Sequence, residues 1–132
     1  MKCLVIDDEP LVRRSLLRVL QVRGHQGFEA EDGPKGLAIW RELQPDLVFV
    51  DILMPGMSGP DVVSQVLPSL TIRPFVVLMS AYSGEDSERL AADCGANYFL
   101  AKPFEDLFAV VDEAIERSGA ARLSLAGVCC CR

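Results

Sequence analysis

The chain has 132 residues, half of them hydrophobic and 24% charged, which predicts a single folded domain and excludes a disordered or fibrous protein. Its 13 basic and 19 acidic residues give a formal net charge of −6. We therefore expect no direct binding of nucleic acid, and a cation or a basic protein surface is the expected kind of partner.

The sequence carries no recognisable membrane or export signal. Its apolar runs have the length of strands, far below the about 20 residues of a membrane-spanning helix. Lys2 is followed by only four apolar residues, which is too few for a signal peptide. We therefore expect a cytoplasmic protein that does not contact a membrane.

The five cysteines do not form a metal or disulfide pattern. Cys3 and Cys94 lie within apolar segments and are predicted core residues. Because no CxxC pair occurs, neither a disulfide framework nor a zinc site is expected. The sequence assigns no role to Cys129, Cys130 and Cys131.

Short apolar runs alternate with helical patterns along the chain. The first helical pattern has Pro10 at its start and Gly24 at its end, which suit those two positions. Its apolar residues recur with a helical period, and Arg13, Arg14 and Arg18 are predicted to lie on the opposite side. In chain order the whole pattern predicts a strand at 3–6, a helix at 10–22, a strand at 28–30, a helix at 33–43, a strand at 47–50, a helix at 60–67, a strand at 75–79, a helix at 85–94, a strand at 98–100 and a helix at 105–117.

This order is strand followed by helix, five times over. The strands are continuously apolar, which is typical of a parallel sheet with helices on both faces. The predicted fold class is therefore α/β, a flavodoxin-like (βα)5 three-layer sandwich with the parallel strand order 2-1-3-4-5. Such folds bind ligands at the carboxyl ends of their strands.

The domain is predicted to end before the chain does. Residues 1–117 hold all the strand and helix patterns, and residues 118–132 are rich in Ser, Gly and Ala. We expect this C-terminal tail or linker to be poorly ordered, as chain termini usually are.

Polar side chains follow four of the five predicted strands. Asp7 and Asp8 follow the first strand, Asp51 the third, Ser80 the fourth and Lys102 the fifth. Each has an ordinary explanation on its own: a helix N-cap, a turn residue, a loop hydroxyl and a solvated lysine. Because the carboxyl ends of parallel strands share one edge of the sheet, their joint occurrence predicts a single site.

These residue types fit phosphoryl chemistry. Three close carboxylates repel one another unless a cation neutralises them, and Mg²⁺ prefers oxygen ligands of this kind. A carboxylate can act as a nucleophile and form an aspartyl phosphate. Lys102 would supply positive charge and Ser80 a hydrogen bond to a phosphoryl oxygen, and phosphoryl transfer depends mainly on such alignment and charge neutralisation.

Several stretches taken together resemble the receiver domain of response regulators in two-component signalling. The resemblance covers residues 1 to about 117. The departures are modest: Ser80 stands where threonine is common in the family, and Phe99 where tyrosine is frequent. The matching stretches are Leu4-Val5-Ile6-Asp7-Asp8-Glu9-Pro10, Asp51-Ile52-Leu53-Met54-Pro55-Gly56-Met57-Ser58-Gly59, Met79-Ser80-Ala81-Tyr82, Gly95-Ala96-Asn97-Tyr98-Phe99 and Lys102-Pro103-Phe104.

The resemblance implies that Asp51 is the phosphoacceptor, supplied from a phosphohistidine on a sensor histidine kinase or a histidine phosphotransfer protein. It implies that Mg²⁺ (or Mn²⁺) is ligated by Asp8 and Asp51, and by Asp7 directly or through water. It also implies that the backbone carbonyl of Leu53 completes the protein ligands and that Lys102 pairs with the phosphoryl group.

The same resemblance makes Ser80 and Phe99 a switch pair, in which the hydroxyl moves to the phosphoryl oxygen and the ring turns into the vacated space. The alternative is that Phe99 is simply a buried core aromatic. The face formed by helix 85–94, strand 97–100 and helix 105–117 is expected to respond and to control a partner or effector.

Leu11, Val12 and Phe104 are candidate docking residues for a helical partner beside the pocket; the alternative is that they belong to the core. The expected output is a downstream protein target or a missing effector domain, with a possible homodimer on phosphorylation.

Two other functions compete with a phosphorylatable receiver. One is a Mg²⁺-dependent phosphotransferase or phosphatase that turns over small phosphate esters, for which the chain has no room to form a lid. The other is a receiver-like scaffold, which the intact acidic set disfavours. We therefore expect a signalling module that catalyses only its own phosphorylation and dephosphorylation, not an enzyme.

Overall fold

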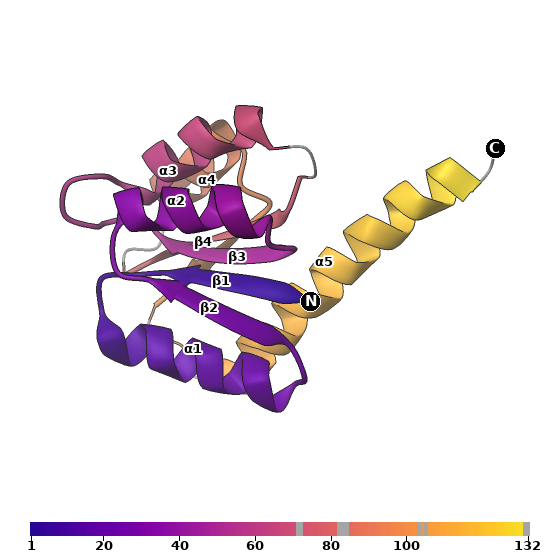
Figure 1. Ribbon diagram of the computed structural model, residues 1–132, viewed down its shortest axis with the longest axis horizontal. Coiled ribbons are helices and arrows are strands. Elements are labelled where there is room, and N and C mark those ends of the chain that lie inside the picture. The colour runs from indigo at the N-terminus through magenta and orange to yellow at the C-terminus, as the bar shows by residue number, and fades with distance from the viewer. Residues whose placement is uncertain (71–72, 82–84, 103, 105, 131–132) are drawn as a thin grey trace.

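The computed structural model describes residues 1–70, 73–81, 85–102, 104 and 106–130, and the side chains of residues 85–88, 91 and 120–130 lie outside this description. Strands and helices alternate along the chain, as the sequence predicts (Figure 1). The elements are β1 (Lys2–Ile6), α1 (Pro10–Val22), β2 (Gln26–Ala30), α2 (Gly33–Leu43), β3 (Leu47–Asp51), α3 (Gly59–Val66), the 3-10 turn η1 (Leu67–Ser69), β4 (Phe75–Ser80), α4 (Glu85–Cys94), β5 (Tyr98–Ala101) and α5 (Leu107–Cys130).

The strands form one parallel sheet in the order β2-β1-β3-β4-β5, which confirms the flavodoxin-like α/β fold. The central strands β1, β3 and β4 are buried almost throughout. Both of their faces are covered, which explains their continuous apolar sequences. The edge strand β2 is exposed except at Ala30, and this is why its sequence gives only a weak strand pattern.

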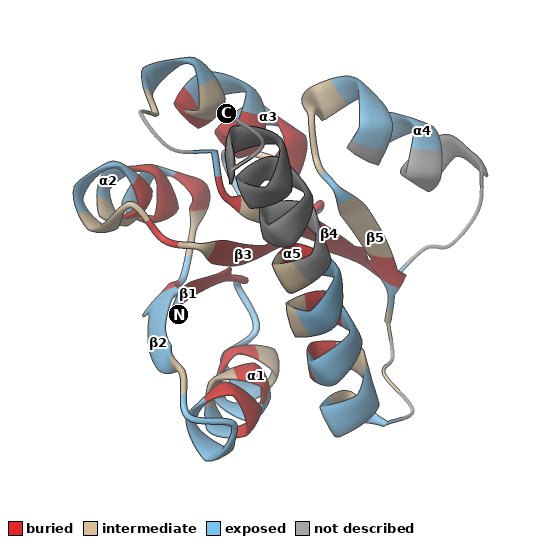
Figure 2. Cartoon of the chain, turned by 90° about the vertical axis from the view of Figure 1, so that its right-hand side faces the viewer, coloured by how far each residue is buried: buried red, intermediate tan, exposed pale blue. Residues whose placement is uncertain are grey.

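Helices cover both faces of the sheet and create two cores (Figure 2). Trp40 of α2 and Val62 of α3 pack on one face. Leu16 of α1 and Val111 of α5 pack on the other. Alternate residues of each strand enter the two cores, because successive side chains of a strand point to opposite faces. The predicted three-layer sandwich is therefore confirmed.

One residue of α1 departs from the prediction. Arg14 and Arg18 are exposed as expected, whereas Arg13 is buried, with only 9% of its surface exposed. Arg13 precedes the buried Leu16 and Leu20 by three and seven residues. At that spacing it belongs to the buried stripe of the helix and not to its solvent face.

The last helix is longer than the sequence predicted. It begins at Leu107, and it continues beyond Arg117 to Cys130 and projects from the body of the domain (Figure 1). Residues 118–130 contain no proline, and their alanine, leucine and arginine residues favour helix. The predicted helix end at Arg117 is therefore wrong, while the division into a domain (1–117) and a tail (118–132) remains a prediction.

Cys3 is buried in the core and Cys94 is half-buried, and neither forms a disulfide within the described part of the chain. The side chains of Cys129 and Cys130, and all of Cys131, lie outside the described residues. Among the helices described, none combines the length and apolar character needed to cross a lipid bilayer.

Candidate functional site

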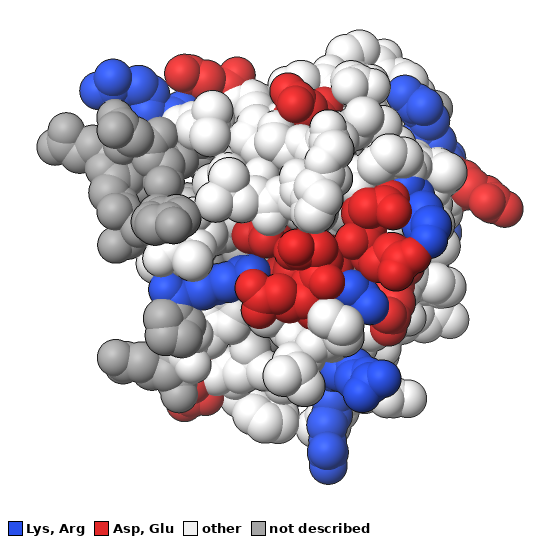
Figure 3. All heavy atoms as spheres, turned by 90° about the vertical axis from the view of Figure 1, so that its left-hand side faces the viewer, with Lys and Arg blue, Asp and Glu red and all other residues white. Residues whose placement is uncertain are grey.

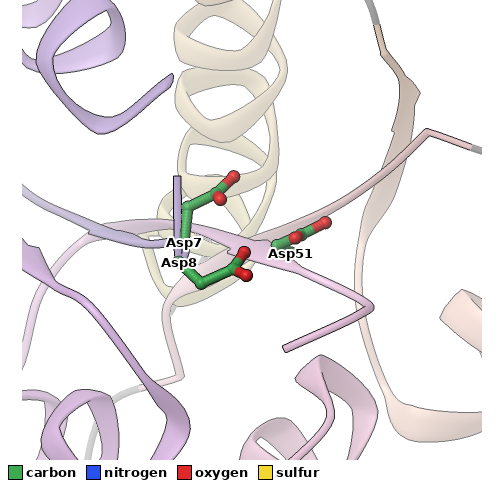
Figure 4. A group of neighbouring side chains, drawn as sticks. All are labelled: Asp7, Asp8 and Asp51. Carbon is green, nitrogen blue, oxygen red and sulfur yellow. The ribbon is translucent and has the colours of Figure 1, made fainter. Parts of the chain in front are cut away.

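The three predicted acidic residues meet at the carboxyl edge of the sheet. Asp7 and Asp8 follow β1, and Asp51 is the last residue of the neighbouring strand β3. One carboxylate oxygen from each residue lies within 4.8 Å of the others. Figure 4 shows the three carboxylates turned toward the same side, so the predicted acidic cluster is confirmed.

Lys102 completes the cluster and contacts two of its carboxylates. It follows β5, and its Nζ lies 2.7 Å from Asp7 Oδ2 and 3.5 Å from Asp51 Oδ1. Its side chain is only 10% exposed. The lysine therefore compensates part of the negative charge without leaving the pocket.

Burial sets the electrostatics of the pocket. Burial, followed by repulsion from Asp7, raises the pKa of Asp51 from an ordinary value of 3.8 to about 6, although Lys102 opposes this rise. Burial also raises the pKa of Asp7, against hydrogen bonds from Lys102 and from the backbone of Glu9. Burial lowers the pKa of Lys102, but its hydrogen bond to Asp7 and its attraction to both carboxylates outweigh this, so its pKa is raised.

The donor set suits a hard divalent cation. One ammonium group does not balance three carboxylates, and burial, the largest cause of the raised pKa values of Asp7 and Asp51, adds to the cost of keeping them ionised. Asp8 is exposed, so the cluster is open to solvent on one side. Figure 3 shows a concentrated acidic area on this face of the molecule, bordered by basic side chains. Mg²⁺ binds such oxygen sites while keeping several waters, so the residues present fit this ion.

With metal removed by EDTA, the Asp51 carboxyl should make the folded protein less stable at high pH. Its folded pKa is about 6 and its ordinary value is 3.8. The stability that this raised pKa gives is fully present below a pH of about 4, and it is lost as the pH rises through about 6. Urea unfolding should therefore show Asp51→Asn more stable than the unsubstituted protein by roughly 1–3 kcal/mol at a pH of about 8, and by much less at a pH of about 4.

The control for this pH dependence is Asp93→Asn, which removes an exposed carboxylate of α4. We expect it to change the free energy of unfolding by a similar small amount at both pH values. A stability gain for Asp51→Asn that is the same at both pH values would contradict the raised pKa.

The predicted switch residues lie on the same side of the sheet. Ser80 ends β4 and is buried, and Phe99 of β5 is half-buried and packs against the core on the α2 and α3 face. Phe99 pairs in register with Leu78, two residues before Ser80. Residues two apart on a strand share a face, so both side chains point to the same layer. The role of the pair as a switch stays a prediction.

The loop after β3 is held close to the site. The amide of Ile52 donates to Met79 O at 2.8 Å, and the amide of Gly59 donates to Ile52 O at 2.9 Å. Leu53 lies in this loop with an exposed side chain, and the role of its carbonyl as a ligand stays a prediction.

The candidate docking residues border one groove beside the pocket. Leu11 is 76% exposed, whereas Val12 and Phe104 are half-buried and pack against the α1–α5 core. All three line a groove of about 210 Å³ between α1 and the start of α5. Val12 and Phe104 also line an adjoining hollow that reaches Lys102. Pro103, which the sequence motif includes, lies outside the described residues.

Sequence reasoning missed two residues at this site. Arg13 donates from Nη1 to the backbone oxygen of Asp7 at 2.6 Å. Glu9 lines the hollow that contains Lys102. The spacing of Arg13 to Leu16 was a signal that could have identified it as buried.

The fold and the site together define a doubly wound α/β domain. At the carboxyl ends of its strands lies an acidic pocket whose residues suit a divalent cation. The response regulator receiver domain family matches residues 3–112. The chain belongs to this family of two-component signalling domains, which are signalling modules and not conventional enzymes.

Curated relatives match this chain over part of their length. The chain is 38% identical over 120 residues to the transcriptional regulatory protein KdpE of Mycobacterium tuberculosis, covering 89% of this chain and 52% of that protein. It is 36% identical over 119 residues to the transcriptional regulatory protein PdtaR of the same species, covering 88% and 57%. The chain thus spans about half the length of these curated relatives.

Solved structures agree with the fold. The response regulator TrrA of Thermotoga maritima, crystallised in complex with Mg(2+)-BeF, is 31% identical, with a TM-score of 0.76 over 89% of this chain and 97% of that one. The chemotaxis protein CheY4 of Vibrio cholerae has a TM-score of 0.81 at 24% identity, over 89% and 97%, and supports the fold alone.

Proposed function

We propose that this receiver domain accepts a phosphoryl group on Asp51 from a phosphohistidine of a sensor histidine kinase or a histidine phosphotransfer protein, in a reaction that depends on Mg²⁺ or Mn²⁺. A bond forms between an Asp51 oxygen and phosphorus while the phosphorus–nitrogen bond of the donor breaks, and the imidazole keeps the electron pair. The observation that carries the proposal is the Asp51 carboxylate between two acidic neighbours and the Lys102 ammonium.

The acidic residues are the proposed metal ligands. Asp8 and Asp51 would ligate the ion directly, Asp7 directly or through water, and the Leu53 carbonyl would complete the protein ligands. A divalent cation held there would neutralise charge on the carboxylates and on phosphoryl oxygens. The relative TrrA, crystallised with Mg(2+)-BeF, supports this assignment.

The phosphoryl group would be read by two further side chains. Lys102 already contacts Asp7 and Asp51 and can pair with an added phosphoryl oxygen. Ser80 ends β4 at the same sheet edge, and its hydroxyl can donate to another oxygen. Because that hydrogen bond exists only in the phosphorylated state, it favours one conformer. Phe99 would then turn and alter the face of α4, β5 and α5.

The partners belong to the same proposal. The groove lined by Leu11, Val12 and Phe104 opens beside the pocket and would receive the helical phosphodonor. The α4, β5 and α5 face would act on a downstream protein target or an effector domain, or would form a homodimer after phosphorylation. A complex of the chemotaxis proteins CheX and CheY from Borrelia burgdorferi is one example of a receiver-fold protein bound to a partner.

The test uses a small phosphodonor. The protein is incubated with phosphoramidate and MgCl₂, and intact mass is followed over time. We expect one phosphoryl group per chain, found by peptide mapping on the segment that contains Asp51, and no incorporation with EDTA. Incorporation elsewhere, or incorporation that EDTA leaves unchanged, would contradict the proposal.

The competing functions give different results in the same assay. Continuous release of phosphate from sugar phosphates would favour a phosphotransferase or phosphatase. A protein that neither binds Mg²⁺ nor takes up phosphoryl groups would be a scaffold with a receiver fold.

A further inference from the structure

We propose that Arg13 is a positioning residue of the acidic pocket, and that its guanidinium holds the backbone of Asp7 so that the Asp7 carboxylate stays at the metal position. This inference rests on the proposed Mg²⁺ site. It adds a residue that lies outside the acidic cluster and would act on the metal only through Asp7.

Arg13 buries a charge on the core side of α1. Arg13 lies on the buried stripe of α1, where its helix neighbours Leu16 and Leu20 are apolar. Burying a guanidinium is costly unless its donors are paired. Arg14, the next residue, is exposed and carries the same charge without that cost. The buried position therefore calls for a specific pairing.

That pairing joins three elements. Arg13 Nη1 donates to the backbone oxygen of Asp7 at 2.6 Å, and Arg13 Nε donates to Glu29 Oε1 at 3.0 Å. Asp7 follows β1, Glu29 lies in β2 and Arg13 lies in α1. The planar fork of the guanidinium fixes the direction of both hydrogen bonds, which a lysine ammonium does not.

The carbonyl that Arg13 binds lies just beyond the sheet. The register of β1 ends at Ile6, which pairs with Ala30 on one side and Val50 on the other. The amide of Asp7 still donates to Ala30 O at 3.2 Å. Arg13 supplies the donor for the Asp7 carbonyl at the point where the ladder stops.

Asp7 is consequently held at all four of its polar atoms. Its amide and carbonyl bind Ala30 and Arg13, as described above. Its Oδ1 accepts from the Glu9 amide at 2.9 Å, and its Oδ2 accepts from Lys102 Nζ at 2.7 Å. Of the two residues that fix its backbone, only Arg13 uses a side chain, so a substitution there can release Asp7 without changing a carboxylate.

The experiment compares Mg²⁺ affinity in Arg13→Gln and in the matched control Arg14→Gln. MgCl₂ is titrated into each protein and followed by the NMR shifts of the amides of residues 7–9 and 51–53. Both substitutions remove one positive charge from the same helix, and this alone would strengthen Mg²⁺ binding slightly. Positioning predicts the opposite sign for Arg13→Gln, an about tenfold weaker affinity, while Arg14→Gln should change affinity by less than about twofold.

A conservative variant separates positioning from folding. Arg13→Lys keeps the charge but loses the fork, and we expect it to weaken Mg²⁺ binding in the same direction by a smaller factor. The NMR spectrum reports whether each variant is folded. If Arg13→Gln is unfolded, the Mg²⁺ affinity of Arg13→Lys tests the proposal instead. If the unsubstituted protein binds Mg²⁺ and the folded variant binds it equally well or more tightly, the positioning role of Arg13 is overturned. The proposed Mg²⁺ site is not.

Glu29 provides a second, coupled test. Glu29→Gln should weaken Mg²⁺ affinity less than Arg13→Gln, because Glu29 acts only by orienting the guanidinium. The double variant should be no weaker than Arg13→Gln alone, since both substitutions break one linkage. If the losses of Mg²⁺ affinity were fully additive, Arg13 and Glu29 would not act through one linkage, which would contradict the proposal. Absence of Mg²⁺ binding by the unsubstituted protein would instead overturn the proposed function.

Discussion

An Asp51→Asn variant is expected to take up no phosphoryl group from phosphoramidate, whereas the unsubstituted protein takes up one. Asparagine keeps the size of the side chain but lacks the anionic oxygen that attacks phosphorus. It also removes one carboxylate of the three that surround the metal position. Intact-mass measurement of both proteins over the same period, with MgCl₂ present, checks this expectation.

The same substitution should leave the fold intact. Asp51 is 5% exposed, and its burial raises its pKa, so its replacement removes a buried charge and should stabilise the metal-free protein at neutral and higher pH. Loss of phosphorylation together with gained stability cannot be explained by unfolding. Asp93→Asn serves as the control and should be phosphorylated normally. Phosphorylation of Asp51→Asn at the unsubstituted rate would exclude Asp51 as the acceptor.

A Gly59→Ala variant should lose both stability and metal binding. A Cβ atom at Gly59 would lie 2.3 Å from the backbone oxygen of Asp51 and 2.9 Å from its carbonyl carbon. These are backbone atoms, which cannot turn away as a flexible side chain can. Relief requires the start of α3 or the end of β3 to move, which would disturb the hydrogen bond from Gly59 to Ile52 and shift Asp51.

We expect Gly59→Ala to lower the free energy of unfolding by about 3 kcal/mol or more, measured by urea unfolding with EDTA. In the folded fraction, Mg²⁺ affinity should fall as well, because the Asp51 backbone carries the ligand. The control is Gly56→Ala in the same loop. Gly56 has a φ of +85° but nothing within 4 Å of its added Cβ, so only the backbone cost of about 1 kcal/mol is expected. Equal losses in the two variants would show that the close approach to Asp51 is not decisive.

The fold followed from local signals. The central strands are continuously apolar because both their faces are covered, and this pattern is visible without coordinates. The bounds of α1 and α2 agree with those predicted from the sequence, and Pro10 stands at the start of α1 as expected. The edge strand β2 and the end of α5 agreed less well. β2 has little buried surface to impose a pattern, and the sequence after Arg117 contains nothing that must stop a helix.

The acidic site was also predictable, because parallel strands deliver their carboxyl ends to one edge. Asp7, Asp51 and Lys102 meet there at hydrogen-bonding and ion-pairing distances. The sequence indicates Leu11, Val12 and Phe104 as candidate docking residues but does not show that they form a groove. In the structure all three line the same groove. Their distance in the chain, from α1 to the start of α5, hides this proximity.

The α/β class, the order of the elements and the acidic residues at the strand ends can all be predicted without coordinates, because they depend on periodicity and on the shared edge of parallel strands. The buried pairing of Arg13 with Asp7 and Glu29, and the close approach of Gly59 to the Asp51 backbone, become visible only in the folded chain. These contacts join different secondary-structure elements, so no periodicity within one helix or strand predicts them, and their energies come from burial and close approach.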